Sequence, residues 1–134
     1  MENRYLFRGK RIDNGEWVEG YLSYPFCKKK GNESYYFYVK DSLGFFCRCV
    51  VDASTICRCT GREDMNGKLI FENDIVKCLY YCYGEKYVYI GKVIYREDIC
   101  RFVATNSEST DFKWWDEEKE VIGNVFDNPE LLEV

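Results

Sequence analysis

The chain has 134 residues, a formal net charge of −4 and an aromatic content of 18%. This length suits one domain that buries about two-thirds of the surface of its unfolded form, so folding requires neither a metal nor a disulfide. The sequence contains no histidine, which excludes His-based triads, histidine acid–base catalysis and zinc sites that need imidazole.

Charge is unevenly divided along the chain. Residues 1–63 carry 11 basic and 8 acidic side chains, a net charge of +3, whereas residues 64–134 carry 8 basic and 15 acidic side chains, a net charge of −7. Such asymmetry is typical of head-to-tail self-association or of a basic partner, and it also arises from scatter over a solvated surface. The overall acidity predicts weak, salt-sensitive binding to nucleic acid.

Short extended segments separated by turns are predicted along most of the chain. Turn sequences such as Asn-Gly and Asp-Asn-Gly recur, and the abundant aromatic residues favour a pleated sheet. The spacing predicts a mainly β, short-stranded meander in a single domain, residues 1–134, with lobes at 1–62 and 63–134. We expect strands near residues 4–9, 16–23, 34–40, 44–51, 54–59, 75–82, 86–95, 99–105 and 120–126.

Two of these strands have informative faces. The strand at residues 16–23 can place Trp17, Glu19 and Tyr21 on one face. The strand at residues 87–95 is apolar on both faces, which predicts a central position or a contact with another molecule, and Gly91 indicates a bulge or bend. The aromatic residues expected on an interaction surface are Tyr36, Tyr38, Tyr87, Tyr89, Trp114 and Trp115.

Helix is scarce in the prediction. Residues 107–118 are expected to form a loop or a short helix. Near the end, Asn128 is a suitable N-cap and Pro129 fits the first helical position. We therefore expect a short C-terminal helical turn that buries Leu131 and Leu132.

The N-terminal residues lack the apolar segment of about 7–15 residues that a signal peptide requires. The longest apolar run, residues 78–83, is far shorter than the ~20 residues of a membrane helix. We expect a soluble cytoplasmic protein with reduced cysteines and no membrane partner.

Two Cys-x-Cys pairs, Cys47 with Cys49 and Cys57 with Cys59, could bring four thiolates together on neighbouring strands as a zinc site. Structural zinc sites usually draw their ligands from Cys-x-x-Cys knuckles. We therefore favour reduced cysteines that act as small core residues, and we predict no metal and no cofactor.

A further segment combines basic and aromatic residues. Lys28-Lys29-Lys30 precedes Tyr35-Tyr36-Phe37-Tyr38, and single-strand nucleic-acid binders combine phosphate contacts with stacking platforms. A basic loop that leads into a packed aromatic strand gives the same pattern, and only one face of such a strand could stack bases. We therefore do not expect nucleic-acid binding as the main role, and it stays a second hypothesis.

The central segment, residues 60–76, contains Thr-Gly, then Asp-x-Asn-Gly-Lys, an apolar pair and Asn-Asp-Ile-Val. Together with Phe7-Arg8-Gly9-Lys10, the Trp-Val-Glu-Gly-Tyr run at 17–21 and the ending at 121–132, it resembles the YopX family of phage and prophage proteins. The resemblance implies a bacterial or phage origin, self-association, and a β architecture with a C-terminal Src-homology-3-like small barrel. It supplies no activity and no catalytic residue.

The residues of these motifs are expected to be scaffold. Asn66-Gly67 predicts a type I′ hairpin turn, and Asp64 can accept hydrogen bonds from its backbone. Asp74 is placed to satisfy a loop amide or to form a salt bridge; the alternative is a catalytic carboxylate, which would need a partner in a pocket. The structural motif residues at the end of the chain are Gly123, Asn124, Asn128 and Pro129.

We therefore predict a non-enzymatic, homo-oligomeric protein-interaction module that serves a phage or prophage in the cytoplasm of its bacterial host. Its partners would be further copies of itself or another protein. The second hypothesis is a nucleic-acid-associated small-barrel protein, and the third is an enzyme that uses carboxylates or a thiol.

Overall fold

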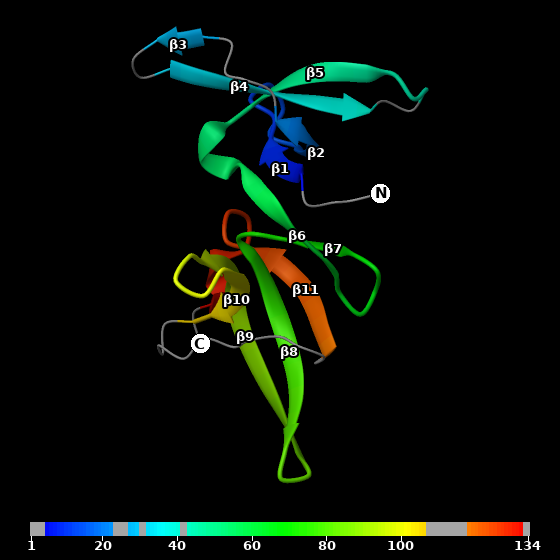
Figure 1. Ribbon diagram of the computed structural model, residues 1–134, viewed down its shortest axis with the longest axis vertical. Helices are drawn as coiled ribbons and strands as arrows, with labels where there is room; N and C mark the ends of the chain where they lie inside the picture. The colour runs from blue at the N-terminus through cyan, green and yellow to red at the C-terminus, as the bar shows by residue number, and fades with distance from the viewer. Residues whose placement is uncertain (1–4, 23–26, 30–31, 41–42, 107–117, 133–134) are drawn as a thin grey trace. The chain divides into compact units, whose positions relative to one another are not determined.

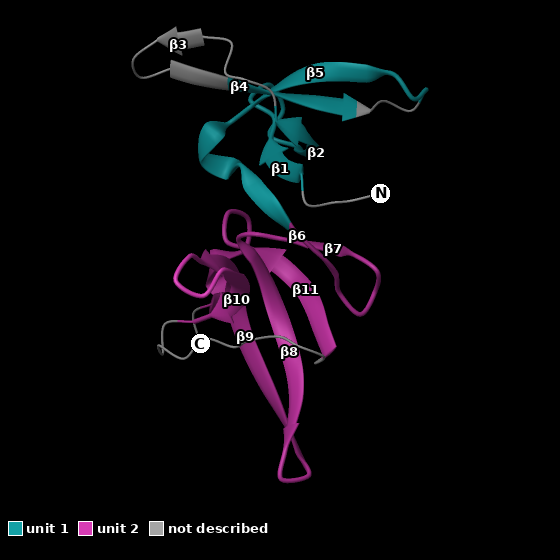
Figure 2. Ribbon diagram, viewed as in Figure 1, with its two compact units in different colours: residues 1–59 teal, residues 60–134 magenta. Residues whose placement is uncertain are grey.

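The computed structural model describes residues 5–22, 27–29, 32–40, 43–106 and 118–132 (Figure 1). The chain divides into two compact units, residues 1–59 and 60–134 (Figure 2). Nearly all regular structure is β-strand, and the helical segments within the described residues are two 3-10 turns, η1 (Ala53–Thr55) and η2 (Pro129–Leu132). The predicted mainly β class is confirmed.

Unit 1 is built on an antiparallel sheet. Its strands run in the order β5, β4, β2, β1 and the start of β6, and β3 pairs with the first part of β4. A bridge between Arg11 and Val51 also joins β5 to the chain just after β1. The bounds are β1 (Leu6–Lys10), β2 (Trp17–Leu22), β3 (Cys27–Lys29), β4 (Asn32–Lys40), β5 (Phe46–Val51) and β6 (Cys57–Glu63).

The core of unit 1 lies on one face of this sheet. Phe37 and Val51 are fully buried, and Cys49 beside them is nearly so. Gly9 faces them from β1, and a Cβ there would lie 3.3 Å from both the Phe37 ring and the Val51 side chain. The alternation along β4 explains the burial, because Phe37 points inward while Tyr36 and Tyr38 point to the opposite face.

Unit 2 contains the end of β6, which pairs with β7, and a four-stranded antiparallel sheet in the order β10, β9, β8, β11. Its core consists of Ile70, Val76, Cys78, Val93 and Ala104, with Tyr89, Phe102 and Val121 packed against it. The bounds are β7 (Leu69–Phe71), β8 (Asp74–Cys82), β9 (Glu85–Arg96), β10 (Arg101–Thr105) and β11 (Glu118–Asn124).

The C-terminal sheet is open rather than closed. β10 and β11 are its edge strands, and neither pairs with a second strand in the described part of the chain. A closed barrel requires hydrogen-bonded pairing between its first and last strands. Backbone groups of β11 bond instead to the β6–β7 turn, where Met65 N donates to Lys119 O at 2.8 Å. The closed Src-homology-3-like barrel that we expected is therefore absent from the described residues.

The predicted strands match the structure except at three places. The short strands β3 and β7 were not predicted, and η1 replaces the start of the strand expected at residues 54–59. The chain forms η2 at the predicted helical turn, but Leu131 and Leu132 are half-buried rather than buried, because one turn of helix covers little surface. The segment at 107–117 lies outside the described residues.

Candidate functional site

Asp64 joins the β6–β7 turn to β11. Its Oδ1 accepts hydrogen bonds from the backbone N–H groups of Asn66 and Lys68, both at 2.9 Å, and its Oδ2 accepts from Val121 N at 3.0 Å. Burial, the largest single influence, raises the pKa of Asp64, but these three backbone donors and the Lys68 charge together hold it below its ordinary value. Asp64 is thus an ionised structural acceptor.

The turn that Asp64 caps differs from the predicted type I′ turn. Gly67 has a φ of 81°, but Asn66 does not have the positive φ that a type I′ turn also requires. Gly67 N donates to Asp64 O at 3.0 Å, and Asp64 N donates to Lys68 O at 2.7 Å. Since Asp64 can hold the turn with its carboxylate, a left-handed conformation is needed only at the glycine.

Asp74 satisfies a loop amide, one of its two expected roles. It is 1% exposed, and its Oδ2 accepts a hydrogen bond from Phe71 N at 2.9 Å. This contact closes the tight β7–β8 turn, in which Asn73 has a φ of 66°. Within the described residues, Asp74 therefore serves the backbone of its own turn.

The C-terminal motif is organised around Asn124. Its Oδ1 accepts hydrogen bonds from Phe126 N at 3.0 Å and Asp127 N at 2.9 Å. Asn128 was expected to cap η2, but its Oδ1 accepts from Asn124 N at 3.3 Å, so its side chain is directed to β11. Gly123 leaves room for it, because a Cβ there would lie 2.6 Å from Asn128 Oδ1. Pro129 is the first residue of η2, as predicted.

The four cysteines considered as zinc ligands do not form a metal site. In the part of the chain that the structure describes, no three His, Cys, Asp or Glu side chains are arranged to hold a metal ion. Cys49, Cys57 and Cys59 are buried, whereas Cys47 is exposed and its Sγ donates to Val39 O at 3.5 Å. Burial is the main cause of the raised pKa of Cys49, which favours its neutral thiol form.

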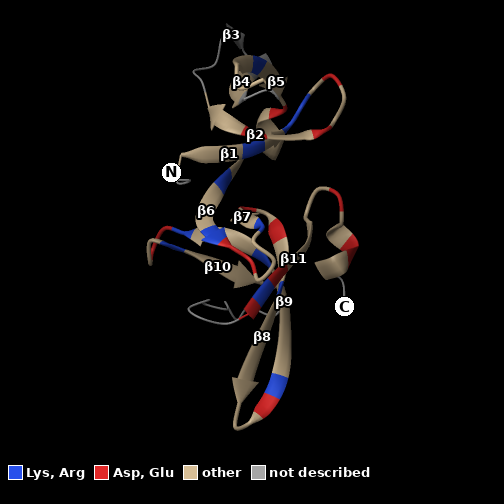
Figure 3. Cartoon of the chain, turned by 90° about the vertical axis from the view of Figure 1, so that its right-hand side faces the viewer, with Lys and Arg blue, Asp and Glu red and all other residues tan. Residues whose placement is uncertain are grey.

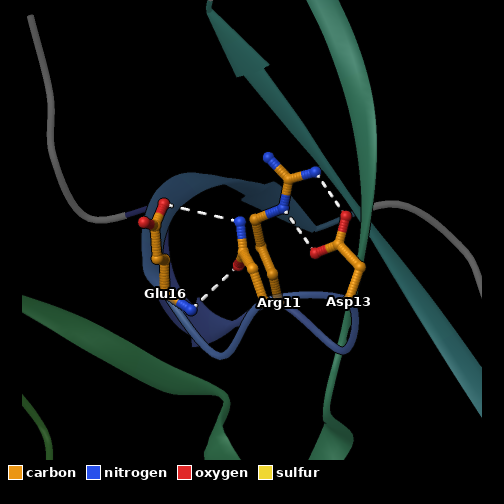
Figure 4. Close-up of polar contacts among 4 residues, drawn as sticks. Arg11, Asp13 and Glu16 are labelled. Carbon is orange, nitrogen blue, oxygen red and sulfur yellow. Dashed lines mark hydrogen bonds and ion pairs between the residues drawn. The ribbon is translucent and has the colours of Figure 1, made fainter.

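A polar turn of unit 1 joins β1 to β2 (Figure 4). Arg11 binds Asp13 through two hydrogen bonds, Nε to Oδ1 at 3.0 Å and Nη2 to Oδ2 at 2.8 Å. The hydrogen bond from Arg11 lowers the pKa of Asp13, and the same bond raises the pKa of Arg11. Because the Asp13 side chain is 63% exposed and the Arg11 side chain 36% exposed, the pair shapes the turn without forming a buried charged site.

The predicted aromatic residues lie on two separate surfaces, one in each unit. Tyr36 and Tyr38 share one face of β4, and Tyr38 is 42% exposed. Tyr87 on β9 is also 42% exposed, whereas Tyr89 packs against the core of unit 2. Trp114 and Trp115 lie outside the described residues.

The surface of unit 2 is the end of the β8–β9 hairpin, residues 80–88, which we call the ribbon. β8 and β9 remain paired as far as Cys82 and Glu85, but β11 pairs with β8 only as far as Leu79. β10 pairs with β9 only from Lys92 onward, so the ribbon extends beyond both neighbouring strands (Figure 1). Its exposed apolar residues are Tyr81, Tyr83, Tyr87 and Val88.

The surface of unit 1 is the face of its sheet opposite Phe37, which we call the outer face. Strand pairing places Tyr38 across from both Tyr21 and Arg48, and it places Trp17 across from Lys10. Paired residues in an antiparallel sheet point to the same side, so aromatic and cationic side chains gather there. Sequence reasoning placed Trp17 and Tyr21 on one face but missed Lys10 and Arg48, which only strand pairing brings to them.

Comparison with known families gives a match to the YopX protein family over residues 6–133. The chain belongs to the YopX family. Among solved structures, the crystal structure of protein EF1440 from Enterococcus faecalis is similar, with a TM-score of 0.53 and 24% sequence identity. The match covers 94% of this YopX-family chain and 96% of that chain, and at this identity it shows a shared fold alone.

A comparison with curated proteins gave no match for this YopX-family chain. Within its described residues, it has no helix with the length and apolar character needed to cross a membrane.

Proposed function

We propose that this YopX-family chain is a non-enzymatic, homo-oligomeric protein-interaction module that serves a phage or prophage. The observation that carries the proposal is the ribbon, which presents large apolar side chains on both of its faces. Tyr81 is 71% exposed, Val88 is 52% exposed, and Tyr83 at the turn is fully exposed. A two-stranded hairpin is marginally stable in water by itself, so a ribbon of this kind gains stability from a surface that covers it.

The turn at the end of the ribbon supports this role. Tyr83 and Gly84 have φ values of 52° and 80°, the two positive angles of a type I′ turn. Among residues other than glycine, Asn adopts the first of these positions with least strain, whereas a tyrosine there costs roughly 1 kcal/mol. Strain held at an exposed aromatic residue is typical of a functional contact.

A second copy of the chain is the partner that suits the ribbon best. Glu85 and Lys86 are its only charged residues, and they are adjacent (Figure 3). Strand alternation places Glu85 on the face of Tyr80 and Tyr87, where Tyr87 OH donates to Glu85 Oε2 at 3.0 Å, and it places Lys86 on the opposite face. A two-fold contact brings the same patch of both copies together, so the Tyr80–Tyr87 face can pack on its own copy. The stacked pair Tyr80 and Tyr87, with ring centroids 5.5 Å apart, provides a rigid apolar surface between the copies.

The test is the molar mass in solution, measured by multi-angle light scattering across a range of protein concentrations. The wild-type chain should exceed its monomer mass of 16.0 kDa. Tyr83→Asn should shift the protein towards monomer while raising its thermal stability, because Asn suits the turn but removes the exposed ring. These opposite effects separate loss of an interface from loss of folding.

Cys100→Asn is the matched control. Cys100 is exposed and has the same φ of 52°, but it lies in the β9–β10 turn. Relief of strain there should raise stability and leave the mass unchanged. A wild-type monomer at every concentration, or an equal loss of mass in both variants, would refute the proposal.

A further inference from the structure

We propose that the outer face of unit 1 binds single-stranded nucleic acid, with aromatic rings that stack on bases and flanking cations that contact phosphates. Four strands form this face in the order β5, β4, β2 and β1. The middle strands carry the rings, Tyr36 and Tyr38 on β4 and Trp17 and Tyr21 on β2. The outer strands carry the cations, Arg48 on β5 and Lys10 on β1.

This arrangement of rings between cations is the one that a single-stranded nucleic acid requires. Proteins that bind single strands place stacking rings in a groove with positive charge along the backbone path. Along the paired strands, the rings of β4 and β2 lie between Arg48 on β5 and Lys10 on β1. The far ends of β5 and β1 are also joined directly, since Asp52 N donates to Lys10 O at 2.8 Å. A duplex hides its base faces within the stack and cannot use the rings.

Contacts within the face already combine rings and cations. Arg48 Cζ lies 5.5 Å from the centroid of the Tyr36 ring, and Lys10 Nζ lies 5.2 Å from that of Trp17. Cation–π contacts of this kind hold each cation over its ring. Tyr38 is the most exposed of the four rings, at 42%.

Two further residues limit how many phosphates the face can contact. Glu19 lies across from Arg8 on the same face. Arg8 is only 8% exposed, and its Cζ lies 4.6 Å from the centroid of the Trp17 ring. Arg8 therefore positions Trp17, and the phosphate contacts fall to Lys10 and Arg48.

The division of charge between the units favours unit 1 as the binding part. Its residues 1–59 carry 10 basic and 7 acidic side chains, a net charge of +3, whereas residues 60–134 carry 9 basic and 16 acidic side chains, a net charge of −7. The acidity of the whole chain, which predicted weak binding, comes from unit 2. Attraction of a polyanion depends on charges within a Debye length of about 10 Å, so the local balance decides it.

The experiment is fluorescence anisotropy with a labelled oligothymidine of about eight nucleotides, short enough to occupy one face of one copy. Tyr38→Ala should weaken binding at least about fivefold, the lower end of the loss of one stacked base. Tyr38→Phe keeps the ring and should keep the affinity. Tyr87→Ala, at an equally exposed tyrosine on the ribbon, is the matched control and should bind as the wild type does.

Salt dependence tests the cations separately. Two phosphate contacts predict a slope of log K against log salt of about −1.4, which is roughly a sevenfold loss between about 50 and 200 mM salt. Lys10→Gln and Arg48→Gln should each reduce the slope by about 0.7, and the control Lys86→Gln should leave it unchanged.

Four results would overturn the proposal. The first is no binding of the oligonucleotide at low salt, and the second is equal binding of a duplex of the same length. The third is equal loss in Tyr38→Ala and Tyr87→Ala. Displacement of the oligonucleotide by poly-glutamate at equal charge concentration would also count against it, because an acidic peptide shares the charge but not the bases.

Discussion

Replacement of Asp64 offers the sharpest test of how unit 2 is held together. Asp64→Ala removes one carboxylate that accepts three backbone hydrogen bonds, two within its own turn and one from Val121 on β11. A hydrogen bond to a charged group contributes about 1.5–3 kcal/mol. Asn66 and Lys68 are exposed, so water can accept the hydrogen bonds that their backbone N–H groups lose. Val121 is half-buried, so its N–H group is less accessible to water.

We therefore expect Asp64→Ala to lower the free energy of unfolding by about 3 kcal/mol. Asp64→Asn should cost about 1–2 kcal/mol, because its carbonyl oxygen can keep the two turn contacts while its NH₂ group faces Val121 N–H. The control is Asp52→Ala. Asp52 is an exposed cap of η1 whose Oδ1 accepts from Ser54 N and Ser54 Oγ, so its loss should cost about 1 kcal/mol.

The assay is urea unfolding followed by far-UV circular dichroism, at a protein concentration low enough that association does not add to stability. Amide hydrogen exchange at Val121 reports the long-range contact directly and should accelerate in both Asp64 variants. If Asp64→Ala costs no more than Asp52→Ala, or if exchange at Val121 is unchanged, the joining role of Asp64 is wrong.

Three further predictions concern acid, packing and thiols. The pKa of Asp64 is lower in the folded state than in the unfolded state, where it is near 3.9. The stability that this gives is fully present above the unfolded pKa and is lost as pH falls through the folded pKa. The difference in unfolding free energy between wild type and Asp64→Asn should therefore shrink below about pH 4. An unchanged difference at low pH would contradict this. Gly91→Ala should destabilise the fold by about 1–3 kcal/mol in thermal unfolding, because its Cβ would lie 2.8 Å from Thr105 O; an unaltered melting temperature would show that the strands can separate. A thiol reagent should modify exposed Cys47 quickly and buried Cys49 slowly, and equal rates at the two sites would contradict their assigned burial.

The sequence by itself determined the features that depend on neighbouring residues. Aromatic and turn residues indicated a mainly β chain, and most strands lie close to their predicted positions. Asp64 was correctly assigned to its turn, because its contacts with Asn66 and Lys68 span two and four residues. Such contacts follow from local backbone geometry, which short sequence patterns record.

Tertiary structure alone decided which distant residues meet. The bond from Val121 to Asp64 spans 57 residues, and no local pattern predicts it. The same holds for the place of Arg48 beside Tyr38. Among the residues that the structure describes, it also holds for the open edges of the C-terminal sheet and for the end of the β8–β9 hairpin, which no third strand accompanies. Strand order and register are set by the packing of the whole sheet, since any alternating strand can pair with several others until the core selects one arrangement.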